Sequence, residues 1–177
     1  MKAASPHRMR LHFCEPRKNH CVTIKDAMSC FTTGVTVVTA HTQGQDWGMT
    51  CNSFNTVSLT PPMVLWSVRK SSMSHDAFVN AGGYMVNVLS GSQKELALKF
   101  AQGTQQERFA NQNLERGQQQ HPRFEGVLAW FDCRLAQVVS AGDHDILIGE
   151  VLDFGMQPGR GLAYAQRSFG VVADFED

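Results

Sequence analysis

The sequence predicts a mainly β domain, an antiparallel sheet or barrel with helices attached at its ends. Segments with strand character outnumber those with helical character, and most are joined by turns instead of regular helical crossovers. The odd positions from 127 to 139 also form a mostly apolar face at period two, which is typical of a strand. A length of 177 residues suits one domain that buries a sizeable core.

Seven segments are expected to be strands. The run 35–40 is rich in β-branched residues, and 47–54 follows turn residues at 44–46. Two consecutive prolines, Pro61 and Pro62, break the chain before the apolar run 63–68. The other strands are expected at 83–89, 127–139, 145–152 and 162–165, with a turn at Gly142-Asp143 and a loop over 155–161.

Three helices are expected between these strands. Thr23 is suited to cap a helix that Gly34 ends, with one apolar stripe formed by Ile24, Ala27, Met28 and Phe31. A short helix is expected at 74–80. Ser92 to Glu95 has the pattern of a capping box, opening a helix with Leu96 and Phe100 on one side. The Gln/Asn-rich stretch 102–120 follows without a predicted element.

Charge divides the chain into a basic leader, residues 1–22, and a domain, residues 23–177. The whole chain carries 16 Lys+Arg and 16 Asp+Glu, so no overall field attracts nucleic acid or acidic membranes. The leader has five basic residues against Glu15 and lacks interleaved aromatics, so we expect a solvated, poorly ordered tail. It has no apolar core of a secretory signal, and no stretch reaches the roughly 20 apolar residues of a membrane span.

The cysteines point to a reducing compartment. Their number, five, is odd, and they are scattered without CxxC spacing, which favours free thiols in the cytoplasm over disulfides or a zinc finger. His12, Cys14, His20 and Cys21 faintly resemble a metal box, but their spacing is wrong for structural zinc. No metal is therefore expected.

Familiar catalytic and nucleotide motifs are absent. The chain has no GxGxxG after a strand and no GxxxxGK[ST], and Gly159-Arg160-Gly161 is only a turn. Ser, His and Asp are all present, but no serine lies in a GxSxG elbow, so a hydrolase has no positive support.

Two polar segments carry more information. Gly48 to Ser53 places small and amide-bearing residues along a strand edge, where a planar heterocycle can approach the backbone. Ser67 to Ser74 places two cations and four hydroxyls before a helix, which suits a phosphate monoester. A polar loop with an ordinary serine cap is an equally good interpretation of the second segment.

Taken together, ordered motifs over residues 24–170 resemble the flavin reductase-like domain. The resemblance rests on 31–39, 48–54, 57–62, 86–89, 96–100, 131–133, 142–150 and 161–164, with Arg167 and Phe169. The segment 131–150 is particularly similar to reductases that serve pyrimidine and aromatic-ring oxygenation. The family includes reductase components of two-component monooxygenases, and it implies a Greek-key split β-barrel of the FMN-binding type and a homodimer with flavin near the subunit interface.

The resemblance also implies roles for particular residues. The isoalloxazine ring would be lined by Gly48, Met49, Thr50, Asn52 and Ser53. The ribityl chain and phosphate would be held by Ser67, Arg69, Lys70, Ser72 and Ser74, with Lys99 and Phe100 closing the site. The incoming nicotinamide dinucleotide would lie near His144, which is taken as the catalytic residue, and near Tyr164, Arg167 and Phe169. From the residues alone, His144 would be a turn residue and Tyr164 a core residue.

The implied activity is hydride transfer from NADH or NADPH to FMN or FAD, with reduced flavin diffusing to an oxygenase. Two departures from the family pattern bear on it. Met73 and Ser74 stand where a basic residue or Thr is common, and Ala165-Gln166 replaces an aromatic followed by Arg or Lys. The alternatives are a flavoenzyme of the same fold that reduces a corrinoid or ferric chelate, and a non-catalytic flavin-binding module, which the altered Ala165-Gln166 favours.

Overall fold

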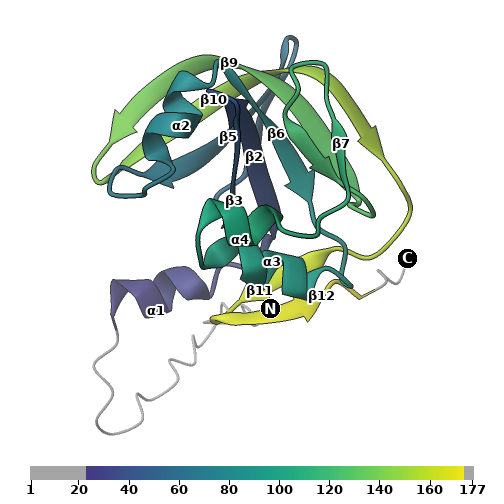
Figure 1. Ribbon diagram of the computed structural model, residues 1–177. Coiled ribbons are helices and arrows are strands. Elements are labelled where there is room, and N and C mark those ends of the chain that lie inside the picture. Colours follow the sequence, from purple (N-terminus) through teal and green to yellow (C-terminus); the bar gives the residue numbers. More distant parts are fainter. Residues whose placement is uncertain (1–22, 174–177) are drawn as a thin grey trace, which may run out of the picture.

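The computed structural model describes residues 23–173, and its main element is a seven-stranded antiparallel sheet (Figure 1). The strands lie in the order β3-β2-β6-β9-β10-β5-β4. Their bounds are β2 Thr36–Thr42, β3 Gln45–Cys51, β4 Asn55–Leu59, β5 Pro62–Arg69, β6 Gly83–Val88, β9 Ala129–Ala141 and β10 His144–Met156. The predicted mainly β fold class is confirmed.

The order of the strands forces the sheet to curl. Strands β3 and β4 lie at opposite edges, yet only residues 52–54 connect them. The four Cα steps from Cys51 to Asn55 span at most about 14 Å, whereas seven strands laid flat would separate their edges by about 29 Å. The sheet therefore bends until its edges meet, and because β3 and β4 share no ladder, the barrel has a seam between them.

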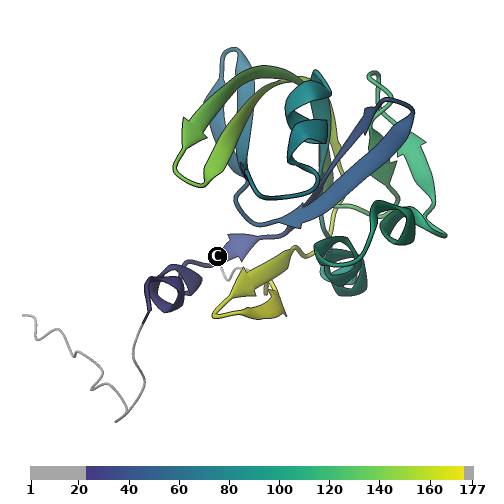
Figure 2. The same cartoon turned by 60° about the vertical axis from the view of Figure 1, so that its left-hand side comes forward.

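Smaller elements surround this barrel (Figure 2). Strand β1 (Thr33–Gly34) joins the hairpin β11 (Leu162–Ala165) and β12 (Ser168–Val171), and β7 (Leu114–Arg116) pairs with β8 (Pro122–Phe124). The helices are α1 (Ile24–Ser29), α2 (His75–Asn80), α3 (Lys94–Ala101) and α4 (Gln105–Phe109). Helix α1 lies away from the barrel, beside the β11–β12 hairpin in both ribbon views.

Two apolar cores hold the sheet, one on each face. Inside the barrel, the Trp66 ring meets Phe78 of α2 edge-on at 4.8 Å and Tyr84 of β6 at 5.8 Å. Outside it, Phe100 of α3 packs against Phe109 and Phe124, each at 5.0 Å between ring centroids. Strand β2 contributes side chains to both cores, and its first five residues are accordingly all buried.

Two helix predictions need correction. The first helix begins at Thr23 with a capping box to Asp26, as predicted, but it ends at Ser29 and not at Gly34. Its stripe is not buried, because Ile24, Met28 and Phe31 are 70%, 68% and 76% exposed. The predicted capping box at Ser92 is wrong. Gln93 is the N-cap of α3, and its amide instead accepts from the Ser90 N–H and donates to the Glu125 carbonyl.

Several short elements were not predicted, namely β1, β4, α4, β7, β8 and β12. A signal for α4 was present in the sequence, since Thr104 and Glu107 form a capping box at its start. The predicted basic leader, residues 1–22, lies outside the described residues. Among the helices of residues 23–173, none has the length and apolar character needed to cross a membrane.

Asn87 fastens the β7–β8 hairpin to the barrel, and its loss should destabilise the fold. This buried side chain donates to the Val37 carbonyl at 3.1 Å and accepts from the Phe124 N–H at 3.0 Å. Asn87→Ala removes the side-chain partner of the Val37 carbonyl and of the Phe124 N–H. We therefore expect the free energy of unfolding, measured by urea denaturation, to fall by about 2–4 kcal/mol. Asn113→Ala, at an exposed position, is the matched control and should cost under about 0.5 kcal/mol. Equal losses in the two variants would contradict this role for Asn87.

Candidate active site

A polar cavity of about 430 Å³ lies along the barrel seam. The end of β3 and the residues after it form one wall, β5 and its following loop form the other, and the first residue of β10 closes one end. The lining residues are Met49, Thr50, Cys51, Asn52, Ser53, Ser67, Arg69, Ser71, Ser72 and His144. Eight of these, all except Cys51 and Ser71, are candidate site residues from the sequence.

The Ser53 hydroxyl holds the two walls together. It accepts from the Ser67 N–H at 3.0 Å and donates to the Ser67 carbonyl at 3.2 Å. One side chain therefore replaces the backbone ladder that is missing across the seam. Thr50 is also engaged, since its hydroxyl donates to the Ala97 carbonyl of α3 at 2.6 Å.

The cavity lining combines hydroxyls and an amide with a single permanent cation, Arg69, and contains no carboxylate. Arg69 is the last residue of β5 and lies opposite His144 in the β5–β10 ladder. Hydroxyls and a guanidinium suit a phosphate group, and the amide of Asn52 can bond the rim of a planar heterocycle. The lining offers no acid–base pair of carboxylates for hydrolytic chemistry.

His144 is oriented by its neighbour. Its Nδ1 lies 2.8 Å from an Asp143 carboxylate oxygen, and this hydrogen bond holds the pKa of Asp143 below its usual range. A neutral His144 thus carries its proton on Nδ1 and presents Nε2 as an acceptor. The side chain is about one-third exposed, at 36%, so a ligand can reach that nitrogen.

Cys51 is the one thiol on the cavity wall, and it is not poised to react. Burial raises the pKa of the Cys51 thiol, even though hydrogen bonds from Thr36 and Ser53 act in the opposite direction. At neutral pH the group is therefore a neutral thiol that packs with the inner core.

Three predicted residues near α3 lie outside the cavity lining. Phe100 is fully buried in the outer core, and Lys99 donates to the Ala110 carbonyl at 2.6 Å. Gly48 allows β3 to approach α3, because a Cβ there would lie 2.6 Å from a Phe100 ring carbon. Its N–H donates to the Gln105 side chain, which the sequence gave no reason to single out.

Two residues of the serine segment are also turned away from the cavity. Lys70 donates to the Ser140 hydroxyl at 2.6 Å and to the Gly142 carbonyl at 2.8 Å, both at the tip of the β9–β10 hairpin. Ser74 is buried and accepts from Gln105 at 2.9 Å. Ser71, which was not a candidate, takes a place on the cavity wall instead.

The three C-terminal candidates lie together on the β11–β12 hairpin, apart from the cavity lining. The rings of Tyr164 and Phe169 meet edge-on at 5.1 Å and pack against the outer core. Arg167 forms an ion pair with Asp26 of α1 at 2.7 Å. The predicted roles of these three in dinucleotide binding stay predictions.

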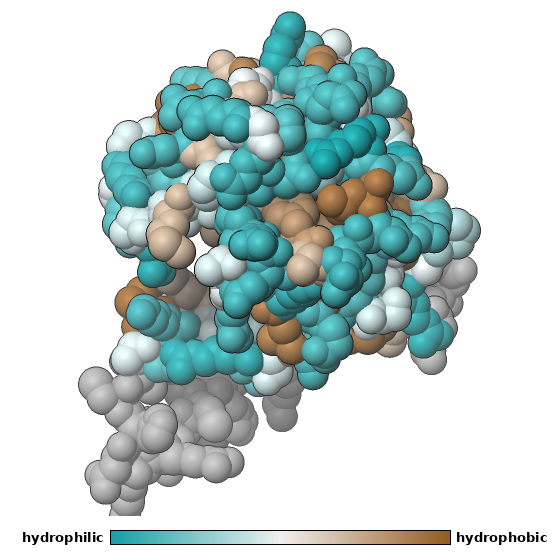
Figure 3. Space-filling model, viewed as in Figure 1, coloured by the Kyte–Doolittle hydropathy of each residue, from teal (hydrophilic) through white to brown (hydrophobic). Residues whose placement is uncertain are grey.

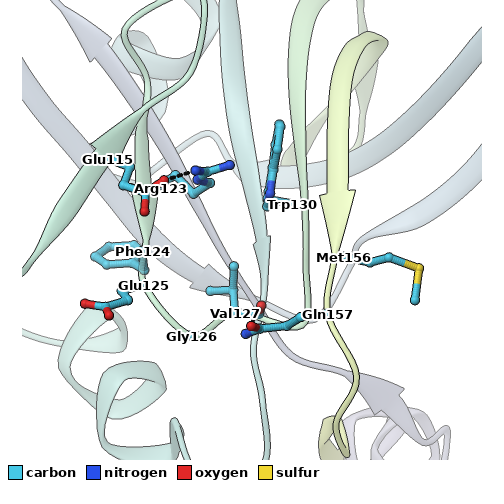
Figure 4. Close-up of a pocket in the computed structure, with 9 residues that line it drawn as sticks. All are labelled: Glu115, Arg123, Phe124, Glu125, Gly126, Val127, Trp130, Met156 and Gln157. Atoms are coloured by element: carbon cyan, nitrogen blue, oxygen red, sulfur yellow. Dashed lines mark hydrogen bonds and ion pairs between the residues drawn. The ribbon is translucent and has the colours of Figure 1, made fainter.

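A second cavity, of about 230 Å³, lies between β8 and the paired ends of β9 and β10 (Figure 4). Its cation is already engaged, because the Arg123 guanidinium stacks 4.4 Å above the Trp130 ring and pairs with Glu115. It shares no lining residue with the seam cavity. The seam cavity is therefore the better candidate site.

Comparison with known proteins shows the family of the chain. The family model described as flavin reductase like domain matches residues 28–173. The chain is 41% identical over 159 residues to the FMN reductase (NADH) SmoA of Agrobacterium fabrum, which is 90% of each protein. It is 41% identical over 147 residues to the reductase component of the flavin-dependent trigonelline monooxygenase of Acinetobacter baylyi, covering 82% of this chain and 47% of that protein. The chain therefore spans about half the length of some curated relatives that it matches.

A solved structure shows the same likeness in three dimensions. The NADH:FAD oxidoreductase SgcE6 of Streptomyces globisporus, in complex with NAD and FAD fragments, matches with a TM-score of 0.81 and 32% identity. The match covers 86% of this chain and 93% of that chain.

Proposed function

The chain belongs to the flavin reductase-like domain family of flavin oxidoreductases, and we propose that it transfers hydride from NADH to FMN or FAD and supplies reduced flavin to a monooxygenase. The observation that carries this proposal is the seam cavity, which gathers eight candidate residues from three separate strands and two loops. FMN reductases that use NADH, and reductase components of monooxygenases, are among the chain's relatives. We further place the protein in the cytoplasm, because its described cysteines are free.

The residues of the cavity fit a flavin. The amide of Asn52 and the edge of β3 suit the polar rim of the isoalloxazine ring, and Ser67, Ser71 and Ser72 suit the ribityl chain and phosphate. Arg69 supplies the positive charge for the phosphate. Bound together, the dinucleotide and flavin supply the chemistry themselves, a hydride passing from nicotinamide C4 to flavin N5.

The role of the protein is to position the two cofactors and to stabilise charge on the flavin ring. The walls of the seam would hold the ring in an orientation that leaves room for a nicotinamide, which would remove much of the entropic barrier. Hydrogen-bond donors along the β3 edge would stabilise negative charge on a reduced ring. No protein acid or base is required, which agrees with a cavity lined without carboxylates.

We assign His144 to the dinucleotide. Its Nε2 is free to accept a hydrogen bond from the nicotinamide carboxamide, because Asp143 holds Nδ1. Arg69 lies opposite it in the ladder, so the two side chains lie at the same end of the cavity.

We also propose that the protein is a homodimer. Beyond Glu150, β10 has no strand partner on its β5 side within the described residues, and Leu152, Phe154 and Met156 are exposed there. The exposed stripe of α1 is a second apolar surface. Brown apolar patches interrupt the largely hydrophilic face that Figure 3 shows. Sedimentation velocity should give the mass of two chains, whereas a monomer that reduces flavin at the full rate would contradict the proposal.

The purified protein should oxidise NADH only when a flavin is added. The cavity binds flavin by polar contacts and one exposed cation, so we expect the flavin to be a diffusible substrate. The assay follows NADH absorbance with FMN, FAD or riboflavin, and with NADPH in parallel. Absence of turnover with every flavin and dinucleotide pair would overturn the proposed function.

Arg69→Ala should weaken FMN binding much more than riboflavin binding, because only FMN carries the phosphate. We expect the Kd for FMN to rise about three- to thirtyfold, since an exposed guanidinium is partly screened, with under about twofold for riboflavin. Fluorescence titration measures both constants. Arg134→Ala, an exposed arginine on β9, is the matched control. Equal weakening of both flavins would remove Arg69 from the phosphate site.

His144→Ala should affect the dinucleotide step and spare flavin binding. Loss of one neutral hydrogen bond costs about 0.5–1.5 kcal/mol, so the KM for NADH should rise, or hydride transfer slow, by about two- to tenfold. Stopped-flow reduction of bound flavin over a range of NADH concentrations, beside a flavin titration, separates the two effects. The control is His41→Ala, on β2 opposite the start of β3. If flavin binding collapses instead, His144 supports the flavin site.

A further inference from the structure

The loop that carries Ser71 and Ser72 is tied to the tip of the β9–β10 hairpin. At its start, the Lys70 N–H donates to the Asp143 carbonyl at 3.0 Å. At its end, the imidazole of His75, the first residue of α2, bonds through Nε2 to an Asp145 carboxylate oxygen at 2.7 Å. The two serines that face the cavity therefore lie between two attachments to the same hairpin.

Asp145 is placed for this contact by the pleat of β10. Successive residues of a strand point to opposite faces, so Asp145 faces the barrel interior while His144 faces the cavity. Its ladder partner, Val68, is buried in the inner core, beside Phe78 of α2. Helix α2 thus closes this end of the barrel, and the His75–Asp145 contact joins it to β10 (Figure 1).

The geometry favours a protonated His75. Its Nδ1 lies 2.8 Å from an Asp76 carboxylate oxygen, so both ring nitrogens face acceptors. A neutral imidazole has one N–H, and only the imidazolium supplies two donors. The Asp145 contact is the sheltered one, because the side chains of His75 and Asp145 are 16% and 13% exposed, against 92% for Asp76.

The surrounding charges support the same state. Hydrogen bonds to Asp76 and to Asp145 raise the pKa of His75, and the bond from His75 lowers the pKa of Asp145. Lys70 approaches Asp145 from the loop, with its ammonium 3.6 Å from the second carboxylate oxygen. At the hairpin tip, Asp143 is bonded by His144 and interacts with Arg69.

We propose that His75 and Asp145 are positioning residues whose ion pair latches the cavity loop to the β9–β10 hairpin, so that flavin binding depends on the proton held by His75. This inference rests on the proposed function. At a pH below the titration midpoint of His75, the imidazolium and the Asp145 carboxylate form a charge-assisted hydrogen bond. Above that pH the imidazole is neutral, and any hydrogen bond that it donates to Asp145 is weaker. A loosened latch lowers the fraction of molecules whose loop is ready to bind, and the apparent affinity falls with that fraction.

The test is the pH profile of FMN affinity in the full chain. We expect the Kd for FMN to rise about three- to tenfold as pH increases through the titration of His75, above the ordinary histidine pKa of about 6.5. His75→Gln keeps a neutral hydrogen-bond donor at this position but does not titrate. The dependence of its Kd for FMN on pH therefore reports the titration of the FMN phosphate, which is subtracted from the wild-type profile. In Asp145→Asn, the titration midpoint of the His75 ring, measured by NMR, should move to lower pH. The pH at which the Kd for FMN rises should move with it.

Two controls make the test specific. His41→Gln alters a comparable His–Asp pair, with Asp46 at 2.7 Å, at the other end of β3, and should keep the wild-type profile. Asp76→Asn, which alters the exposed contact, should shift the profile less than Asp145→Asn does. Identical wild-type and His75→Gln profiles, or a His75 ring that titrates below pH 6.5 in the wild type, would overturn the latch. Failure of the wild type to bind FMN at any pH would instead overturn the proposed function.

Discussion

The hydroxyl of Ser53 bridges the seam of this barrel, where the edge strands β3 and β4 share no backbone ladder. Three residues must carry the chain from one edge of a seven-stranded sheet to the other, so the sheet has to curl and its edge strands have to meet. They meet without pairing, and Ser53 satisfies both backbone groups of Ser67 in place of a strand neighbour. The gap beside this bridge is the cavity, whose polar lining is the unpaired rim of two strands. The position of the site thus follows from the connection that forms the barrel.

Much of this arrangement could be predicted from sequence, because it is local or periodic. The strands from 35 to 89 are bounded by glycine and proline, and the long hairpin of β9 and β10 is marked by Gly142-Asp143. The residues after β3 and at the end of β5 carry small and hydroxyl side chains, and the structure brings them together. Short strands such as β4 and β12 were not predicted because their sequences lack a long run of residues typical of strands. Pairing with β5 and β11 stabilises them instead.

The directions of individual side chains could not be predicted in this way. Lys70 was predicted to help hold the phosphate and Lys99 to help close the site, yet each donates to a backbone carbonyl of a neighbouring segment. Phe100 resembles a lid over a ring, but α3 packs so closely on Gly48 that the side chain is enclosed in the outer core. These outcomes depend on contacts between residues far apart in the chain, which periodicity and motif spacing do not encode.

The allocation of positive charge around the cavity has a functional consequence. Of the three basic side chains from Arg69 to His75, two are engaged with the β9–β10 hairpin, and Arg69 alone lines the cavity. A single exposed guanidinium in water holds a phosphate weakly, because solvent and salt screen its charge. Weak anchoring suits the proposed function, in which reduced flavin leaves to reach an oxygenase. The hairpin cations contribute order to the loop instead of charge to the cavity, so the proposed site can position a flavin without retaining it.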